Sequence, residues 1–357
     1  MAKFRILGIS FDHMHMGDLL RQVHDHPQAE IVGLYDPDPA RMAQAVQTFA
    51  IPPDRVFTDL DACLATPADL AILCSTPAAH ADHTDRLAAR GLHVFVEKPF
   101  AANAADARRM IAAMDRAGKL LVVNWPLVWV PAHVTAKRLV DQGMIGTLRE
   151  VHFYDGNRGP LYHLADKVAV SPAEVEAQKP ASWWYKRASG GGSLRDYLGY
   201  GATLGSWFMS GAEPLEITCT TDDTPGIEVD QHAVTVLRYA TGLSRMETRW
   251  GTFTDPWTIQ PQPQCGFTLV GSEGTILSPD YAPHVMVQTR TNPTAHAIAA
   301  DPLPPGQRSA IDYVLHCLAT GTRVTGPLDP AVSLLGQRIV DTAARAATEK
   351  RSLTLLP

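Results

Sequence analysis

The sequence has few cysteines, and none of them is spaced like a metal ligand. Its 357 residues include five cysteines, all far apart in the chain: Cys63, Cys74, Cys219, Cys265 and Cys317. An odd number of scattered cysteines without a Cys-x-x-Cys pair is typical of reduced core thiols, not of a disulfide framework or a zinc site. We therefore predict no metal centre and a cytoplasmic protein.

Long apolar runs and basic clusters are also missing. A membrane helix needs roughly 18 uninterrupted apolar residues, whereas the best candidate, residues 120–132, is broken by Asn124 and two prolines. The apolar run 6–9 near the N-terminus is too short for the core of a signal peptide. With 31 Lys and Arg against 37 Asp and Glu, the net charge is −6, and no basic run is present. These features argue against partners such as membranes and nucleic acids.

Short apolar stretches alternate with helical patterns over the first 125 residues. Strands are predicted at 4–9, 29–35, 70–73, 93–96 and 120–123, and helices at 17–25, 39–49, 79–90 and 103–117. Near-continuous apolar strands separated by helices indicate a parallel sheet that is covered on both faces. The predicted fold class is α/β, with a doubly wound Rossmann domain at residues 1–125.

The pattern changes in the remaining residues, 126–357. Strands are predicted at 146–154, 215–220, 232–239, 244–250, 267–270, 275–277 and 285–288, and helices at 131–141, 196–210, 309–319 and 330–348. Alternating polar and apolar residues indicate an α+β domain with a large, open, mostly antiparallel sheet. Helix 330–348 is a candidate to pack back on the first domain. Residues 155–188 form a long irregular segment, and such segments are usually functional.

The open sheet needs a cover on its second face. Apolar residues alternate along its strands at Val234, Val236, Phe267 and Leu269. Helices of the same chain can cover only one face, so the other is expected to pair with a second copy. We predict a homodimer or a homotetramer.

The turn after the first strand is an irregular dinucleotide site. The usual Gly-x-Gly-x-x-Gly pattern lets the backbone approach a pyrophosphate, but the stretch 8–15 contains only Gly8. The candidates in this turn are Ser10, Phe11 and His13, and a turn without any ligand is an equal alternative. His13 and His15 are two residues apart and lack a nearby third ligand, which is a weak pattern for a metal.

An acidic residue ends the second predicted strand. Asp36 occupies the position from which a carboxylate accepts hydrogen bonds from the adenosine ribose and repels a 2′-phosphate. Asp38 is better placed to cap the helix that starts at Pro39. The sequence therefore favours NAD over NADP as the cofactor.

Three further motifs occur in a fixed order: Thr76-Pro77-x-x-His80, Glu97-Lys98-Pro99 and Asp196-x-x-x-Tyr200. With Ile145-Gly146 before the first strand of the second domain, they resemble the glucose-fructose oxidoreductase / inositol dehydrogenase / rhizopine-catabolism (Gfo/Idh/MocA) family over nearly the whole chain. The resemblance implies an NAD(P)-dependent oxidoreductase that transfers hydride between a sugar, polyol or related cyclic hydroxyl compound and nicotinamide.

The resemblance also implies the site residues. Lys98 and Asp196 match the family's lysine and aspartate, and Tyr200 stands where many members have histidine and the glucose-fructose oxidoreductase type has tyrosine. Thr203 replaces a polar acid or amide found in many members. The cofactor-binding residues expected besides those of the first turn are Asp36, Thr76, Pro77, His80, Glu97, Lys98 and Asn124, and the expected substrate contacts are Trp125, Arg158, Trp184 and Tyr185.

The chemistry of alcohol oxidation agrees with this assignment. A hydroxyl proton must be removed while hydride leaves the carbon. We assign Lys98 and Tyr200 as the pair at the reacting hydroxyl, with Asp196 orienting them, and expect the nearby ammonium to lower the pKa of Tyr200.

Other interpretations stay open at this stage. Trp183, Trp184 and Tyr185 suit either a sugar or an oligomer interface. An NAD-dependent glycosidase that oxidises its substrate transiently, or a non-catalytic sensor of NAD or sugar, would use the same scaffold.

Overall fold

The computed structural model describes residues 3–222 and 224–357. Its first part is a parallel sheet of six strands in the order β3-β2-β1-β4-β5-β6. The strands are β1 (Phe4–Ile9), β2 (Ala29–Tyr35), β3 (Val56–Phe57), β4 (Leu70–Leu73), β5 (His93–Glu97) and β6 (Leu121–Asn124). The helices between them are α1 (His15–Asp25), α2 (Pro39–Thr48), α3 (Leu60–Leu64), α4 (His80–Ala89) and α5 (Ala104–Ala117). This order confirms the doubly wound α/β fold, because it reverses between β1 and β4.

The second part is an eight-stranded sheet in the order β14-β13-β12-β11-β7-β10-β9-β8. Its strands are β7 (Leu148–Asn157), β8 (Glu216–Thr221), β9 (His232–Arg238), β10 (Leu243–Trp250), β11 (Gly266–Gly271), β12 (Gly274–Pro279), β13 (His284–Thr289) and β14 (His296–Ala299). Only β7 and β10 pair in parallel, so the prediction of a large, mostly antiparallel sheet is confirmed. The helices are α6 (Pro131–Asp141), α7 (Pro172–Gln178), α8 (Ser193–Phe208), α9 (Ala310–Thr320) and α10 (Pro330–Glu349).

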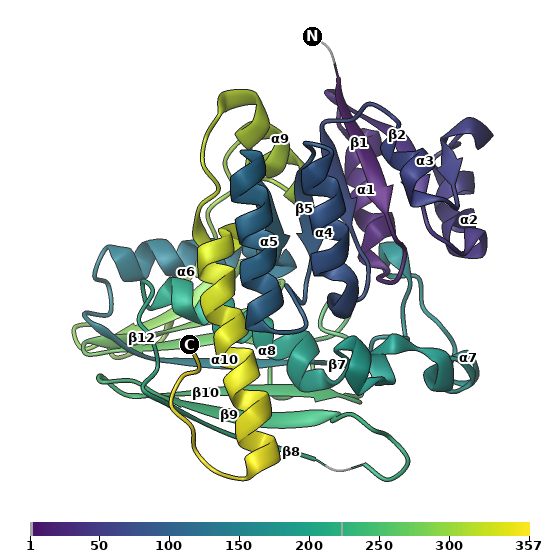
Figure 1. Cartoon of the computed structure of the whole chain (residues 1–357). Helices are drawn as coiled ribbons and strands as arrows, with labels where there is room; N and C mark the ends of the chain where they lie inside the picture. The colour runs from purple at the N-terminus through teal and green to yellow at the C-terminus, as the bar shows by residue number, and fades with distance from the viewer. Residues whose placement is uncertain (1–2, 223) are drawn as a thin grey trace.

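Helices α6, α8 and α10 pack against one face of this sheet, and Figure 1 shows the parallel sheet on the same side of it. Phe267 and Leu269 are fully buried on that covered face. Val236 of β9 pairs with Arg245 of β10, which is in register with His152 of β7. His152 in turn pairs with Thr268 of β11, so Val236 shares a face with Thr268 and not with its neighbour Phe267. Of the alternating apolar residues, Phe267 and Leu269 thus lie on the covered face, and Val234 and Val236 lie on the uncovered one.

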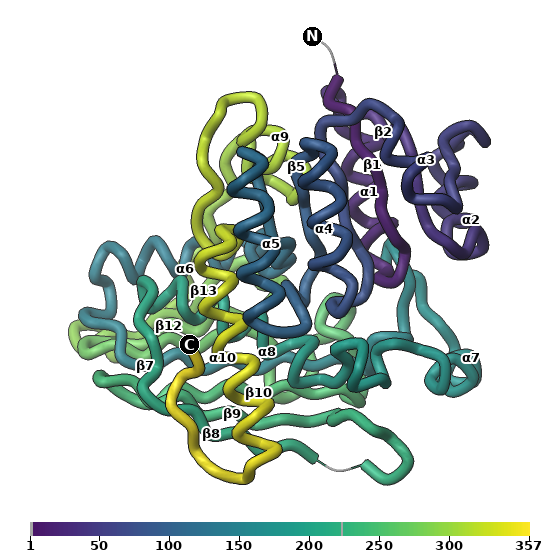
Figure 2. The backbone as a smooth tube through the Cα atoms, in the orientation of Figure 1, coloured from purple at the N-terminus to yellow at the C-terminus, as the bar shows by residue number. Residues whose placement is uncertain are grey.

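Helix α10 lies beside α5 of the first part and beside α8, as the tube trace also shows (Figure 2). Asp341 Oδ2 accepts a hydrogen bond from the amide of Ala104 at 2.6 Å, and Gln337 Oε1 accepts one from Ala101 at 3.3 Å. Gly336 allows the close approach to α8, since a Cβ there would meet Thr203 Oγ1 at 2.1 Å. Thr203 thus packs between helices.

The segment 155–188, which was predicted to be irregular, begins as the end of β7 and continues through α7 and short helical turns. Its turns cross the first part of the chain. Asp166 pairs with Arg21 of α1, and the indole of Trp183 donates to the backbone oxygen of Asp12 at 2.7 Å. The segment therefore covers the loop that follows β1.

Candidate active site

Lys98 and Asp196 form a buried ion pair between the two parts of the chain. Lys98 follows β5 at the carboxyl edge of the parallel sheet, and Asp196 lies in the first turn of α8. The ammonium Nζ is 2.6 Å from Asp196 Oδ1, and Trp250 Nε1 donates to Asp196 Oδ2 at 3.1 Å. Both charged side chains are nearly excluded from solvent, at 5% and 3% exposure. A buried pair of this kind is stable only while both partners remain.

The pair lines a pocket of about 80 Å³, which we call the Lys98 pocket. Other residues that line it are His13, Asp155, Tyr197, Tyr200 and Asp280. The Tyr200 ring centroid lies 5.4 Å from Lys98 Nζ. Asp196 and Tyr200 are four residues apart on α8, so they share one helix face.

Burial raises the pKa of Tyr200 well above its usual value, and the negative charge of Glu97 adds to this shift. The expectation that the ammonium of Lys98 lowers this pKa is therefore wrong, because desolvation of the phenolate dominates. Tyr200 is thus a hydrogen-bond donor at neutral pH.

A hydrogen-bonded cluster adjoins Lys98. Glu97 Oε1 lies 2.9 Å from His15 Nδ1, and Glu97 Oε2 accepts a bond from Asn124 Nδ2 at 2.7 Å. Burial opposes ionisation of Glu97, but His15 and Lys98 outweigh it, so the pKa of Glu97 is lowered. His15 is a site residue that the sequence did not indicate beyond a weak metal pattern.

Two buried polar atoms of this cluster have no partner within the described residues: His13 Nε2 and Asn124 Oδ1. His13 Nδ1 accepts a bond from the amide of His15 at 3.1 Å, so its Nε2 carries the proton. The cluster offers one free donor and one free acceptor, which fit the C=O and NH2 of a carboxamide. The same tautomer leaves His13 Nε2 without a lone pair for a metal, although His13, His15 and Glu97 lie close together.

Two carboxyl groups lie at the floor of the pocket. Asp155 and Asp280 are buried close to Cys265, and Asp280 Oδ1 is 2.8 Å from His133 Nε2. Burial, followed by the charges of Asp280 and Asp196, raises the pKa of Asp155 well above its usual value. Burial among other carboxylates thus disfavours the charged form of Asp155.

The loop after β1 is held by side chains instead of glycines. Ser10 adopts a left-handed conformation (φ 65°). Asp36 is fully buried, and its two oxygens accept from the amides of Phe11 at 2.7 Å and Asp38 at 2.9 Å. Burial raises the pKa of Asp36, and these backbone bonds oppose the shift. Asp38 caps α2 through Ala40, as the sequence predicted.

Comparisons with known proteins identify the family of this chain. Residues 3–125 match the family model described as an oxidoreductase family with an NAD-binding Rossmann fold, and residues 133–277 match that of the GFO/IDH/MocA C-terminal domain. The chain belongs to the Gfo/Idh/MocA family. The resemblance inferred from its motifs is thereby confirmed, as is an NAD-binding Rossmann fold of the oxidoreductase type.

Individual Gfo/Idh/MocA relatives are more distant. D-apiose dehydrogenase from Paraburkholderia graminis is 35% identical over 149 residues, which are 41% of this chain and 38% of that protein. Inositol 2-dehydrogenase from Rhizobium meliloti is 22% identical over 298 residues, 80% of this chain and 81% of that one. The structure of aldose-aldose oxidoreductase from Caulobacter crescentus superposes with a TM-score of 0.78 at 20% identity, over 99% and 100% of the two chains. The first curated relative is thus matched over about two fifths of its length.

The structure brings three of the motif residues together in the Lys98 pocket. Lys98, Asp196 and Tyr200 line the pocket, and so does Trp184, whose ring lies 5.3 Å from Lys98 Nζ. His80 is buried beside the backbone oxygens of Ser75 and Phe100, at 2.9 and 3.1 Å, so it shapes the loops around Thr76 and Pro77.

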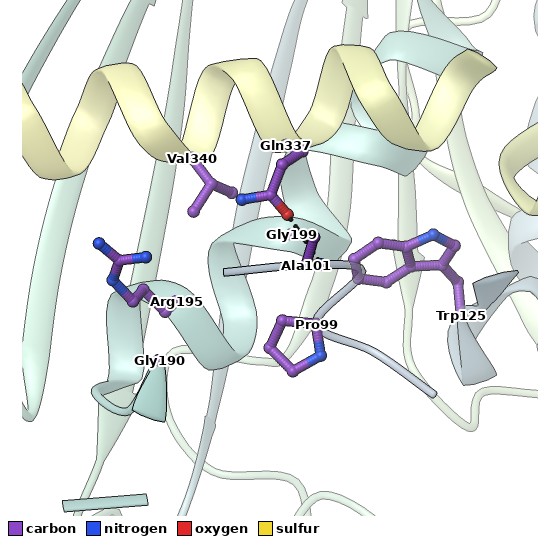
Figure 3. Close-up of a pocket in the computed structure, with 8 residues that line it drawn as sticks. All are labelled: Pro99, Ala101, Trp125, Gly190, Arg195, Gly199, Gln337 and Val340. Atoms are coloured by element: carbon purple, nitrogen blue, oxygen red, sulfur yellow. Dashed lines mark hydrogen bonds between the residues drawn. The ribbon is translucent and has the colours of Figure 1, made fainter. Parts of the chain in front are cut away.

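Other expected substrate residues lie elsewhere. Trp125 is buried against α8, where a Cβ at Gly199 would meet its ring at 2.6 Å. Its indole N–H donates a hydrogen bond to the hydroxyl of Ser333 in the first turn of α10. Figure 3 shows Trp125 beside Gly199, next to the α10 residue Gln337. Tyr185 packs against Trp250, with 5.3 Å between the ring centroids. Neither Trp125 nor Tyr185 lines the Lys98 pocket.

Within residues 3–222 and 224–357, no helix is both long enough and apolar enough to cross a membrane.

Proposed function

We propose that this chain is an NAD-dependent dehydrogenase that acts on a CH–OH group of a sugar, polyol or related cyclic hydroxyl compound. The observation that carries the proposal is the Lys98–Asp196 ion pair beside Tyr200 in one pocket at the carboxyl edge of the parallel sheet. Ligands of doubly wound folds bind at this edge, where the strand order reverses.

The cofactor assignment has independent support. The free donor on His13 and the free acceptor on Asn124 would hold a nicotinamide carboxamide beside Lys98. Ser10, Phe11, Asp36 and the loop of Thr76 and Pro77 would hold the rest of the dinucleotide. When bound, NAD supplies the hydride acceptor.

The chain's own groups account for the proton. Lys98 Nζ and the Tyr200 hydroxyl donate hydrogen bonds to the substrate oxygen and stabilise negative charge on it. Lys98 Nζ gives one of its protons to Asp196 Oδ1, 2.6 Å away, and the neutral amine takes the hydroxyl proton as hydride leaves the carbon, so that Asp196 ends protonated and Lys98 is again an ammonium. Trp184 covers the ammonium and limits access of water.

We also propose that residues 1–125 form the NAD-binding domain and residues 126–357 the substrate-binding and oligomerisation domain. The uncovered face of the eight-stranded sheet includes Val236, which is 36% exposed, and half-buried Val234, Leu277 and Met286. This apolar content supports a homodimer or homotetramer. The five cysteines are buried free thiols, which supports a cytoplasmic location.

The test is NAD+ reduction by the purified protein across a panel of sugars, polyols and glycosides. Formation of NADH with a sugar or polyol is the expected result. Cleavage of a glycoside without net NADH would replace the proposal with an NAD-dependent glycosidase. NAD binding with no turnover of any compound would favour a sensor.

A further inference from the structure

The mouth of the Lys98 pocket carries a cation that has no acidic partner. The other two cations near it are neutralised: Lys98 by Asp196 at 2.6 Å and Arg158 by Asp255 at 2.7 Å. In the described part of the chain, no carboxylate forms an ion pair or hydrogen bond with Lys167, which also lines this pocket. An ammonium in such a cleft is ready to accept an anionic ligand.

An aromatic ring and a histidine accompany this lysine. Lys167 Nζ lies 4.3 Å from the centroid of the Trp257 ring, and the His163 ring lies 4.6 Å from the same ring. His163 is 6% exposed, and its Nδ1 has no hydrogen-bond partner within residues 3–222 and 224–357. Burial, with Lys167 as the next cause, lowers the pKa of His163 to about 3. His163 is therefore neutral here and can offer one ring N–H beside the Lys167 ammonium.

A fixed turn holds Lys167 in place. Residues 163–169 form a tight loop that is closed by a bridge between His163 and Ala169. Both Asp166 and Lys167 are left-handed, each with φ 57°, a conformation that costs non-glycine residues energy. Asp166 is tied to α1 by Arg21 at 2.6 Å, and its amide donates to Asp18 at 2.6 Å. The backbone at Lys167 is thus held by the fold, and the Trp257 ring lies beside its ammonium.

We propose that this mouth binds the carboxylate of a sugar acid, so that the substrate of the dehydrogenase is a uronate or a related sugar carboxylate. The inference rests on the proposed function. The carboxylate accepts hydrogen bonds from Lys167 and from a ring N–H of His163, and the sugar ring lies against Trp257. A hollow of about 310 Å³ continues outward from these three residues and leaves room for the group.

The opposite end of the pocket fixes the orientation. Asp155 and Asp280 are buried carboxyl groups that also line the pocket; they can bond with hydroxyl groups of a substrate and offer no positive charge to a carboxylate. A substrate with its acid group at Lys167 would place its hydroxyls toward the Lys98–Asp196 pair. Charge is therefore distributed along the pocket so as to bind an anionic sugar in one direction.

The test compares matched probes that differ only at one carbon: D-glucuronate with D-glucose, and D-galacturonate with D-galactose. Each is titrated into the protein in the presence of NADH, and each is also assayed for NAD+ reduction. Lys167→Met removes the charge but keeps the length of the side chain, and Lys186→Met, in the same segment but outside the pocket, is the control. The wild type and Lys186→Met should prefer the acids, and in Lys167→Met the KM and Kd for the acids should rise by about 10- to 100-fold, with kcat little changed, because one charged contact is lost.

Equal binding of each acid and its neutral partner by the wild type would overturn the inference, whether or not the neutral sugars are oxidised. An acid preference that survives in Lys167→Met would overturn it as well. Failure to oxidise any compound would instead overturn the proposed function, and the titrations would still decide the carboxylate site.

Discussion

Lys98 Nζ and Asp196 Oδ1 lie 2.6 Å apart although 98 residues separate them in the chain. The bond joins the end of the last but one strand of the parallel sheet to the first turn of α8, which packs on the large sheet. The proposed catalytic lysine in one part of the chain is therefore held by an aspartate of the other part, and loss of either partner leaves a buried charge.

Removal of the two partners should have different results. Lys98→Ala should abolish turnover while NAD still binds, because the proton path is lost. Asp196→Asn should lower both kcat and the free energy of unfolding, the latter by about 3–5 kcal/mol, since the ammonium is left unpaired in the protein interior. Turnover and urea denaturation measure the two effects. An Asp196→Asn protein of wild-type stability would contradict the buried ion pair.

Tyr200→Phe should reduce kcat by roughly 10²–10³, the range for loss of one hydrogen-bond donor to developing negative charge. Because the pKa of Tyr200 is raised by burial, its ionisation should not appear in the pH–rate profile below its usual range. Tyr239→Phe, at a buried tyrosine outside the Lys98 pocket, is the matched control. Full activity of Tyr200→Phe across pH on the true substrate would reduce this residue to a packing role.

The parallel strands were predictable because each is a local run of apolar residues, and β1, β2 and β4 have the predicted bounds. The place of Lys98 was predictable for the same reason, because it directly follows such a strand. The face of the large sheet on which each residue lies was not predictable. Alternation shows which residues of one strand share a face, but the faces of β9 and β11 are related only through their long-range pairing with β10 and β7.

The site residues that the sequence missed come together through tertiary structure. Asp155 ends β7 and Asp280 follows β12, so their proximity depends on sheet register rather than on any local motif. The burial of Trp125 against α8 likewise depends on packing between segments far apart in the chain. Short β3 and α3 were missed because they span too few residues for a periodic pattern.

NADH should bind more tightly than NADPH, because Asp36 and Asp12 lie near the carboxyl end of β2, where negative charge repels the 2′-phosphate of NADPH. Arg41 is the residue that could bind a 2′-phosphate, but it is paired with Asp12. Asp12→Ser should release Arg41 and improve NADPH affinity by about tenfold, the value of one charge-assisted bond. Titration of both nucleotides tests this. Tighter NADPH binding by the wild type would reverse the assignment.

Acid should destabilise the fold through His80. Burial lowers its pKa to about 4 in the folded chain, against 6.5 for a free side chain. Below pH 6.5 the unfolded chain gains a proton that the folded chain does not bind, so stability falls from about pH 6.5 down to pH 4, by about 3 kcal/mol. Between pH 4 and pH 6.5, the free energy of unfolding measured with urea should change less with pH for His80→Gln than for the wild type. His24→Gln, at an exposed histidine, is the control and should keep the wild-type dependence of stability on pH.

The uncovered face of the eight-stranded sheet should hold two copies together. Val236→Lys places a charge on that face and should convert the wild-type dimer or tetramer to a monomer, as measured by light scattering at micromolar concentration. Val168→Lys, at an exposed valine in the 155–188 segment, is the control and should leave the mass unchanged. A monomeric wild type would remove the argument, because the apolar residues of the face would then be in contact with water.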